Sequence, residues 1–188
     1  WAEHRPEEDW WNDFVKITKK ILKASKINPG DISCIATSAI GPCMLPVSYE
    51  GDPLMNAVLY GVDTRAENEI RELNEEVGEE KILQNCGNAL TSQSVGPKIL
   101  WLKKNCPEIF KKAGKILSST SFLVHKLTGE SVIDHYTAAN FTPLYDIKNR
   151  KWTDALTKNI IEIERLPKLM WTTEIAGYVS KAASKETG

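Results

Sequence analysis

The sequence is poor in the residues that form metal sites and disulfide frameworks. It has four cysteines, at positions 34, 43, 86 and 106, and three histidines in 188 residues. No Cys-x-x-Cys pair occurs, which argues against a zinc site, and a disulfide framework does not suit the cytoplasmic setting that we expect. We therefore predict no metal site in this chain and interpret the cysteines as small buried or half-buried thiols.

The chain also lacks an excess of charge of one sign and any long apolar run. Its 24 basic and 25 acidic residues give a net charge of -1. This balance excludes the basic footprint of a nucleic-acid-binding protein, and lysine pairs such as Lys111-Lys112 are typical of solvated helix faces. No apolar run approaches bilayer length, and Trp1 to Trp11 is acidic and aromatic, unlike a signal peptide. We expect a cytoplasmic protein with no nucleic-acid partner and no membrane partner.

Helical and strand patterns follow one another along the chain, which predicts an α/β or α+β fold. The paired tryptophans Trp10 and Trp11 open an amphipathic segment, where packing is the favoured interpretation and an aromatic ligand platform the alternative. The predicted helices span residues 9–27, 65–77, 79–85, 96–105, 108–113, 122–127, 135–139 and 155–159, and another begins after residue 180. The predicted strands span residues 31–38, 43–47, 54–60, 115–118, 132–134 and 175–179.

One stretch concentrates polar groups where a predicted strand ends. The buried strand ending at Tyr60 passes through Gly61-Val62 into Asp63-Thr64-Arg65, and either Asp63 or Thr64 is predicted to cap the next helix. Ligands bind at the carboxyl ends of strands in open α/β sheets, so a ring, a carboxylate and a guanidinium would share one edge. The alternative is that Tyr60 packs, Asp63 only caps and Arg65 is a surface charge.

Several signatures, taken in order, resemble the N-terminal domain of the FGGY family of carbohydrate kinases, which includes glycerol kinase, xylulokinase and gluconokinase. They cover nearly the whole chain. The similar segments are Pro6 to Trp11, Gly51-Asp52-Pro53-Leu54, Ala57 to Tyr60, Asp63 to Ala66, Lys98 to Glu108, Leu127 to Glu130, Ile133 to Ala139, and Tyr145-Asp146 with Trp152.

The resemblance implies a ribonuclease-H-like α/β domain of the actin, hexokinase and Hsp70 type, truncated at both ends, with residues 1–188 forming part of the sugar-binding domain. It also implies transfer of the γ-phosphoryl group of Mg-ATP to a hydroxyl of a sugar or polyol, most like a xylulokinase. Tyr60, Asp63 and Gln93 correspond to the expected substrate contacts. The oligomeric state stays open, a homodimer included.

Two features depart from the family pattern. Ile40-Gly41-Pro42 stands where polar substrate contacts are expected, and Gln93 and Val95 break the first half of the Lys-x-x-Trp signature. The resemblance places the phosphate-binding hairpin before Trp1, the catalytic aspartate beyond Gly188 and the ATP-binding C-terminal domain outside this chain. We therefore expect no catalytic residue and no bound Mg-ATP in the chain alone, and we regard Asp134 as a poor substitute base. The alternative function is a non-catalytic sugar-binding or regulatory module derived from the same domain.

Overall fold

The computed structural model describes all residues from Trp1 to Gly188. Its α-helices are α1 (Asn12–Ser25), α2 (Glu67–Val77), α3 (Glu79–Cys86), α4 (Val95–Asn105), α5 (Pro107–Lys112), α6 (Ser119–Thr128), α7 (His135–Ala138) and α8 (Lys181–Thr187). Other helical turns are η1 (Pro6–Trp11), η2 (Pro29–Asp31) and η3 (Ile163–Arg165). The strands are β1 (Glu3–His4), β2 (Leu45–Val47), β3 (Ala57–Val58), β4 (Lys115–Leu117), β5 (Val132–Asp134), β6 (Tyr145–Asp146), β7 (Lys151–Trp152) and β8 (Lys168–Met170).

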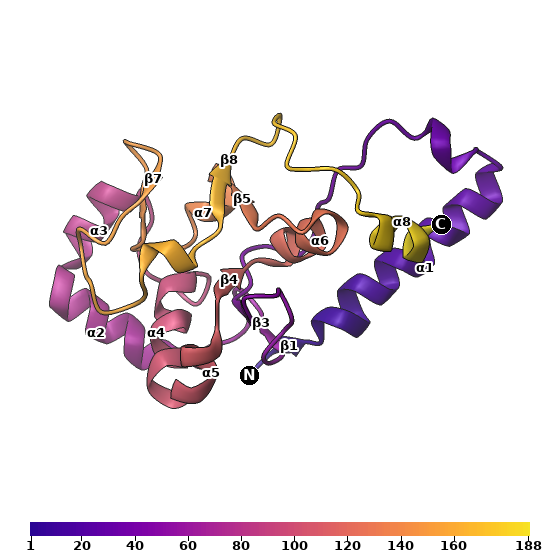
Figure 1. Ribbon diagram of the computed structural model, residues 1–188. Helices are drawn as coiled ribbons and strands as arrows, with labels where there is room; N and C mark the ends of the chain where they lie inside the picture. The colour runs from indigo at the N-terminus through magenta and orange to yellow at the C-terminus, as the bar shows by residue number, and fades with distance from the viewer.

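Helices lie at both ends of the molecule, and α6 and α7 lie in the middle with most of the strands (Figure 1). Helices α2 to α5 form one end, and α1 with α8 forms the other. The strands pair two by two: β1 with β3, β2 with β4 and β6 with β7 are antiparallel, whereas β5 and β8 are parallel. The N-terminus lies beside β1 and β3, so the first residues run close to the stretch that ends at Tyr60.

The central strands separate two hydrophobic clusters. Neighbouring residues of a strand point to opposite faces. On β2 and just before it, Met44 packs into the larger cluster and Leu45 into the smaller one, and on β4 Ile116 and Leu117 divide in the same way. Both faces of β2, and of β4 from Ile116 on, are therefore buried, which explains why these residues are apolar on both faces.

Most predicted helices are confirmed because their start and stop signals are local. Ser118 caps α6 by accepting a hydrogen bond from Ser121 N, and Ser180 caps α8 by accepting one from Ala183 N. Asp134 caps α7 through Thr137 N at 2.8 Å. The glycines Gly78, Gly87 and Gly129 follow α2, α3 and α6 with positive φ, the conformation in which glycine ends a helix.

Several sequence predictions are wrong in detail. Residues 31–38 and 175–179 form no strand, because no neighbouring strand pairs with their backbone. Cys34 and Ile35, which were predicted to be buried, are consequently exposed. Residues 155–159 form bends instead of a helix. Helix α2 starts at Glu67 with Ala66 as its N-cap, so neither Asp63 nor Thr64 caps it. The interpretation of the tryptophan pair as packing residues holds, since Trp10 and Trp11 are both buried in the smaller cluster.

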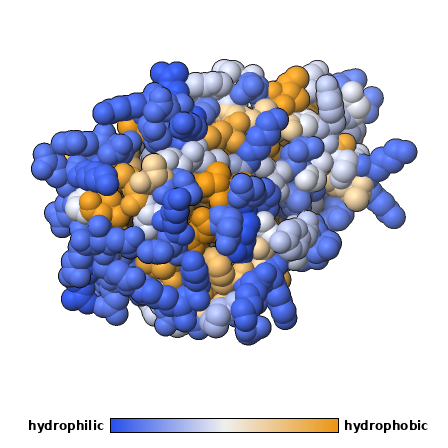
Figure 2. All heavy atoms as spheres, turned by 60° about the vertical axis from the view of Figure 1, so that its left-hand side comes forward, coloured by the Kyte–Doolittle hydropathy of each residue, from blue (hydrophilic) through white to orange (hydrophobic).

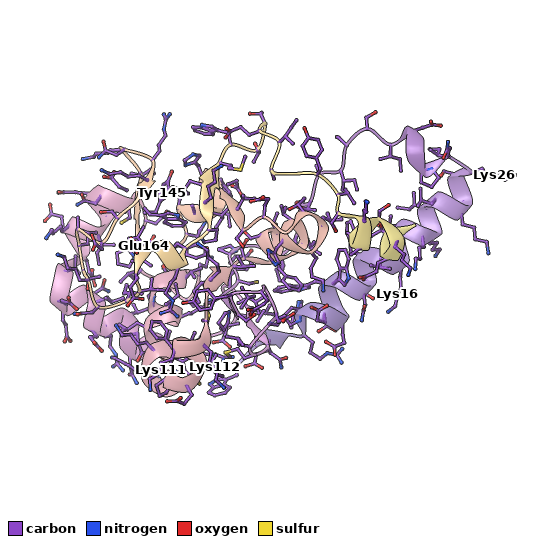
Figure 3. The ribbon with its side chains drawn as sticks, in the orientation of Figure 1. Lys16, Lys26, Lys111, Lys112, Tyr145 and Glu164 are labelled. Carbon is purple, nitrogen blue, oxygen red and sulfur yellow. The ribbon has the colours of Figure 1, made fainter.

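The surface is mostly hydrophilic. Figure 2 brings the α2 and α3 end forward and shows mostly hydrophilic side chains with apolar patches between them. Lys111 and Lys112 lie on the outer edge of α5, and both are exposed, as predicted (Figure 3). No helix combines the length and apolarity that crossing a membrane would require.

Candidate functional site

Three turns from distant parts of the sequence meet at the end of β3. They are the turn at Ile40–Pro42, the turn at Tyr60-Gly61 and the loop at Thr91–Ser94. The first two touch because the ring of Tyr60 lies over Gly41: a Cβ on Gly41 would stand 2.9 Å from Cε1 of Tyr60. A side chain at position 41 would therefore displace the ring, so Gly41 and Tyr60 form one unit.

Two hydrogen bonds tie the turn at Tyr60-Gly61 to the loop at Thr91–Ser94. Gly61 N donates to Ser92 O at 3.2 Å, and Ser92 Oγ donates to Gly61 O at 2.9 Å. Gly61 has φ of +76°, and a Cβ there would stand 3.8 Å from Cγ of Gln93. The half-buried Tyr60 and the exposed Gln93 are thus carried on adjacent, mutually fixed turns.

Asp63 lies in the interior, beneath these turns. Its side chain is fully buried, and it forms an ion pair with Arg65 at 2.8 Å. Arg65 donates to both carboxylate oxygens, Arg65 N donates to Oδ1, and Ala2 N donates to Oδ2 at 2.6 Å. Because a carboxylate accepts about four hydrogen bonds, this carboxylate has its acceptor positions filled by protein.

The Arg65 guanidinium completes this interior cluster. It lies against two tryptophan rings that contact each other, 4.4 Å from the centroid of Trp1 and 4.9 Å from that of Trp101, and it pairs with Glu3 at 2.8 Å. Burial alone would raise the pKa of Asp63, but the hydrogen bonds from Arg65 and Ala2 outweigh it and hold that pKa below its ordinary value. The carboxylate is therefore charged and neutralised inside the protein.

A buried lysine fixes the last residue before Tyr60. Lys98 of α4 is 1% exposed, and its Nζ donates to Leu59 O at 2.8 Å. Burial lowers the pKa of Lys98 to about 8, against the opposite effects of Asp63 and Cys43. Burial likewise raises the pKa of the neighbouring Cys43 thiol to about 11. Lys98 acts on the site through the backbone that carries Tyr60.

The structure places the predicted residues in two different environments. Tyr60 and Gln93 lie on adjacent turns at the surface, where a ligand can reach them, whereas Asp63 is enclosed by Arg65 and the first residues of the chain. Their roles as substrate contacts stay predictions. Asp134, the substitute base considered above, is held by Thr137 through both of its oxygens, which is the role of a helix cap.

Sequence reasoning placed Ile40-Gly41-Pro42 where substrate contacts are expected and Lys98 in a family signature, but it predicted neither the contact of Gly41 with Tyr60 nor the burial of Lys98. Lys98 could have been found from periodicity, because it shares a helical face with Val95, Ile99 and Leu102, all of which are fully buried. The contact of Gly41 with Tyr60 had no such signal, since it joins turns that are distant in sequence.

Comparison with solved structures defines the fold. The whole chain superimposes on 39% of the xylulose kinase from Rhodospirillum rubrum with a TM-score of 0.91 and 25% identity. This confirms the predicted α/β fold of the actin and hexokinase type.

Comparison of sequences then defines the family. Residues 1–188 match the model of the FGGY family of carbohydrate kinases, N-terminal domain, and the chain belongs to this family. It is 33% identical to a glycerol kinase of Thermococcus gammatolerans and 25% identical to a xylulose kinase of Staphylococcus xylosus, in each case over 96% of this chain and 37% of the relative. The chain thus spans little more than a third of the length of these relatives.

Proposed function

We propose that the protein containing these residues transfers the γ-phosphoryl group of ATP to a hydroxyl of a sugar or polyol, and that this chain forms part of the wall that binds the acceptor. The observation that carries the proposal is the meeting of Gly41, Tyr60 and Gln93 at one surface of a chain that matches the FGGY N-terminal domain throughout. The proposal includes an ATP-binding domain outside residues 1–188.

The chemistry of the three turns suits such an acceptor. A tyrosine ring offers an apolar face to the carbon skeleton of a sugar, and a glutamine amide offers one acceptor and two donors to its hydroxyls. In the transfer, the acceptor oxygen bonds to the γ-phosphorus, the bond to the bridging oxygen of ADP breaks, and the hydroxyl proton passes to a base. Asp63 is a poor base because its acceptor positions are filled, so the proposed base lies outside this chain.

We assign Asp63 a supporting part in this function. Its Oδ2 accepts from Ala2 N, and Ala2 O in turn accepts from Leu59 N at 3.0 Å. The carboxylate therefore holds the first residues of the chain against the strand that presents Tyr60. It acts on the acceptor by positioning the turn.

The test uses protein expressed from the complete reading frame and measures ADP release with glycerol, xylulose, xylitol and gluconate as acceptors. A ring face that covers roughly 50 Å² of carbon surface contributes about 1.3 kcal/mol at ~25 cal/mol per Å². We therefore expect Tyr60→Ala to raise KM for the acceptor about tenfold while KM for ATP stays unchanged.

Two variants sharpen this test. Tyr60→Phe should keep the parent KM, because it retains the ring. Tyr178→Ala is the matched control, since it removes an 83% exposed tyrosine outside the three turns. Acceptor binding without any ADP release would favour the non-catalytic module, and an unchanged acceptor KM in Tyr60→Ala would refute the assignment of this surface.

A further inference from the structure

A small polar hollow lies beside Gln93. It has a volume of about 210 Å³ and lies between the loop before α4 and the stretch that follows α7. Six of its seven lining residues are polar and none is charged; they are Asn88, Ala89, Thr91, Gln93, Ser94, Asn140 and Thr142. The hollow can hold several water molecules, since one water occupies about 30 Å³. Its polar lining also suits a short polar chain.

The walls of the hollow are held rigidly. Val95 N donates to Asn140 O at 2.9 Å, which joins the start of α4 to the stretch after α7. A Cβ on Gly96 would stand 2.3 Å from Thr142 O, so the two walls touch at a point where only glycine fits. On the other side, Thr91 N donates to Ser94 Oγ at 3.1 Å.

Several polar groups in the hollow have no partner within the protein. The side-chain amides of Asn88 and Gln93 form no hydrogen bond to any other residue, and Asn140 uses only its Nδ2, which donates to Tyr136 O. Two complete amides and one carbonyl oxygen are therefore free. A hydroxyl group both donates and accepts, so a row of hydroxyls matches this mixture.

We propose that this hollow is a subsite for the distal hydroxyls of an uncharged polyol or sugar whose reacting end lies at Tyr60. The inference rests on the proposed function and adds the class of acceptor. Gln93 links the two places, because it lines the hollow and also lies against Gly61, the residue after Tyr60.

The lining also sets a charge preference. A carboxylate or phosphate placed there would lose its hydration without meeting any cation, since no lysine, arginine or histidine lines the hollow. Acceptors with an uncharged chain that extends from Tyr60 past Gln93 into the hollow should therefore bind better than the shorter glycerol and better than aldonates of similar length.

The experiment is calorimetric titration of the complete protein with glycerol, xylitol and gluconate. Asn88→Ala removes an exposed amide that makes no bond within the protein, so the fold should be unaffected. We expect this variant to weaken xylitol binding about three- to tenfold, the effect of one or two hydrogen bonds, and to leave glycerol binding unchanged. Gln84→Ala is the control, because it removes an exposed amide of α3 that bonds only to Glu80.

A gain of function tests the charge preference independently. Asn88→Lys puts a cation at the hollow and should bind gluconate more tightly than the parent while losing affinity for xylitol. Equal losses for all acceptors, or no change in either variant while Tyr60→Ala weakens binding, would overturn the subsite and leave the proposed function intact. Failure of the parent protein to bind any acceptor would overturn both.

Discussion

Replacing Lys98 by methionine should change the pH dependence of stability more than stability itself. The side chain is buried in α4, and its pKa falls from 10.5 to about 8 because burial disfavours the charged form. At about 1.4 kcal/mol per pKa unit, keeping this ammonium charged at pH 7 costs about 3 kcal/mol. Methionine removes that cost. It also removes the hydrogen bond to Leu59 O, which contributes about 1.5–3 kcal/mol when the donor is charged.

The two effects nearly cancel, so at pH 7 the Lys98→Met chain should lie within about 2 kcal/mol of the parent. Their pH dependence does not cancel. The pKa of Lys98 is lower in the folded state, so between pH 8 and 10.5 the unfolded state binds more protons and stability rises with pH. The cost is complete below pH 8 and is relieved as the pH rises toward 10.5. The parent should therefore gain about 2 kcal/mol relative to the variant between roughly pH 7 and pH 9.5.

The assay is urea unfolding of the two chains at both pH values, followed by tryptophan fluorescence. The raised pKa of Cys43 makes its own contribution at high pH, but the thiol is present in both chains and largely cancels in the difference. Lys112→Met is the matched control, because it makes the same chemical change on an exposed face of α5. A Lys98→Met difference that stays constant with pH would show that the ammonium is solvated, and the account of the site beneath Tyr60 would fail.

Two further substitutions separate stability from binding. Asp63→Asn removes one of the two carboxylates that pair with the buried Arg65 and leaves only Glu3. It should cost about 3–5 kcal/mol of unfolding free energy, measured by the same urea titration; a loss under 1 kcal/mol would contradict the buried pair. Gly41→Ala brings a Cβ to 2.9 Å from the Tyr60 ring. It should weaken acceptor binding at least threefold in calorimetry, with little change in the free energy of unfolding. Gly30→Ala is the control: its Cβ would meet only Asn28, so neither binding nor stability should change.

The helices could be predicted from the sequence because their signals lie within a few residues. Ser118 and Ser180 cap helices through bonds to residues three positions away, and glycines end them. Strands need partners that the local pattern does not identify. The pairing of β1 with β3 joins Glu3 to Val58, and that of β5 with β8 joins Val132 to Lys168, so neither was predicted. Residues 31–38 have a strand-like composition without a partner, and there the prediction failed.

The candidate site, like the fold, could be predicted only where its signals are local in the sequence. Tyr60 and Gln93 follow elements whose ends are visible in the sequence, and their turns do meet. The burial of Asp63 depends on Ala2 and Glu3, about sixty positions earlier in the chain, and no local pattern reveals such contacts. The same limit applies to the hollow beside Gln93, since Asn88 and Asn140 come together only through the packing of α4.

The division between buried charges and exposed neutral groups bears on the acceptor selectivity that the proposed function implies for this surface. Asp63 and Arg65 pair with each other and Lys98 donates to Leu59 O, so all three charged side chains are buried and none faces the solvent at the turns. What faces the solvent there is a ring and a set of amides and hydroxyls. Such groups discriminate by the number and position of hydroxyls, because an unmatched amide loses its bonds to water without replacement. Under the proposed function, selectivity therefore depends on how rigidly the backbone holds Tyr60 and Gln93, and substitutions at Lys98, Gly41 or Ser92 should alter it without touching the acceptor.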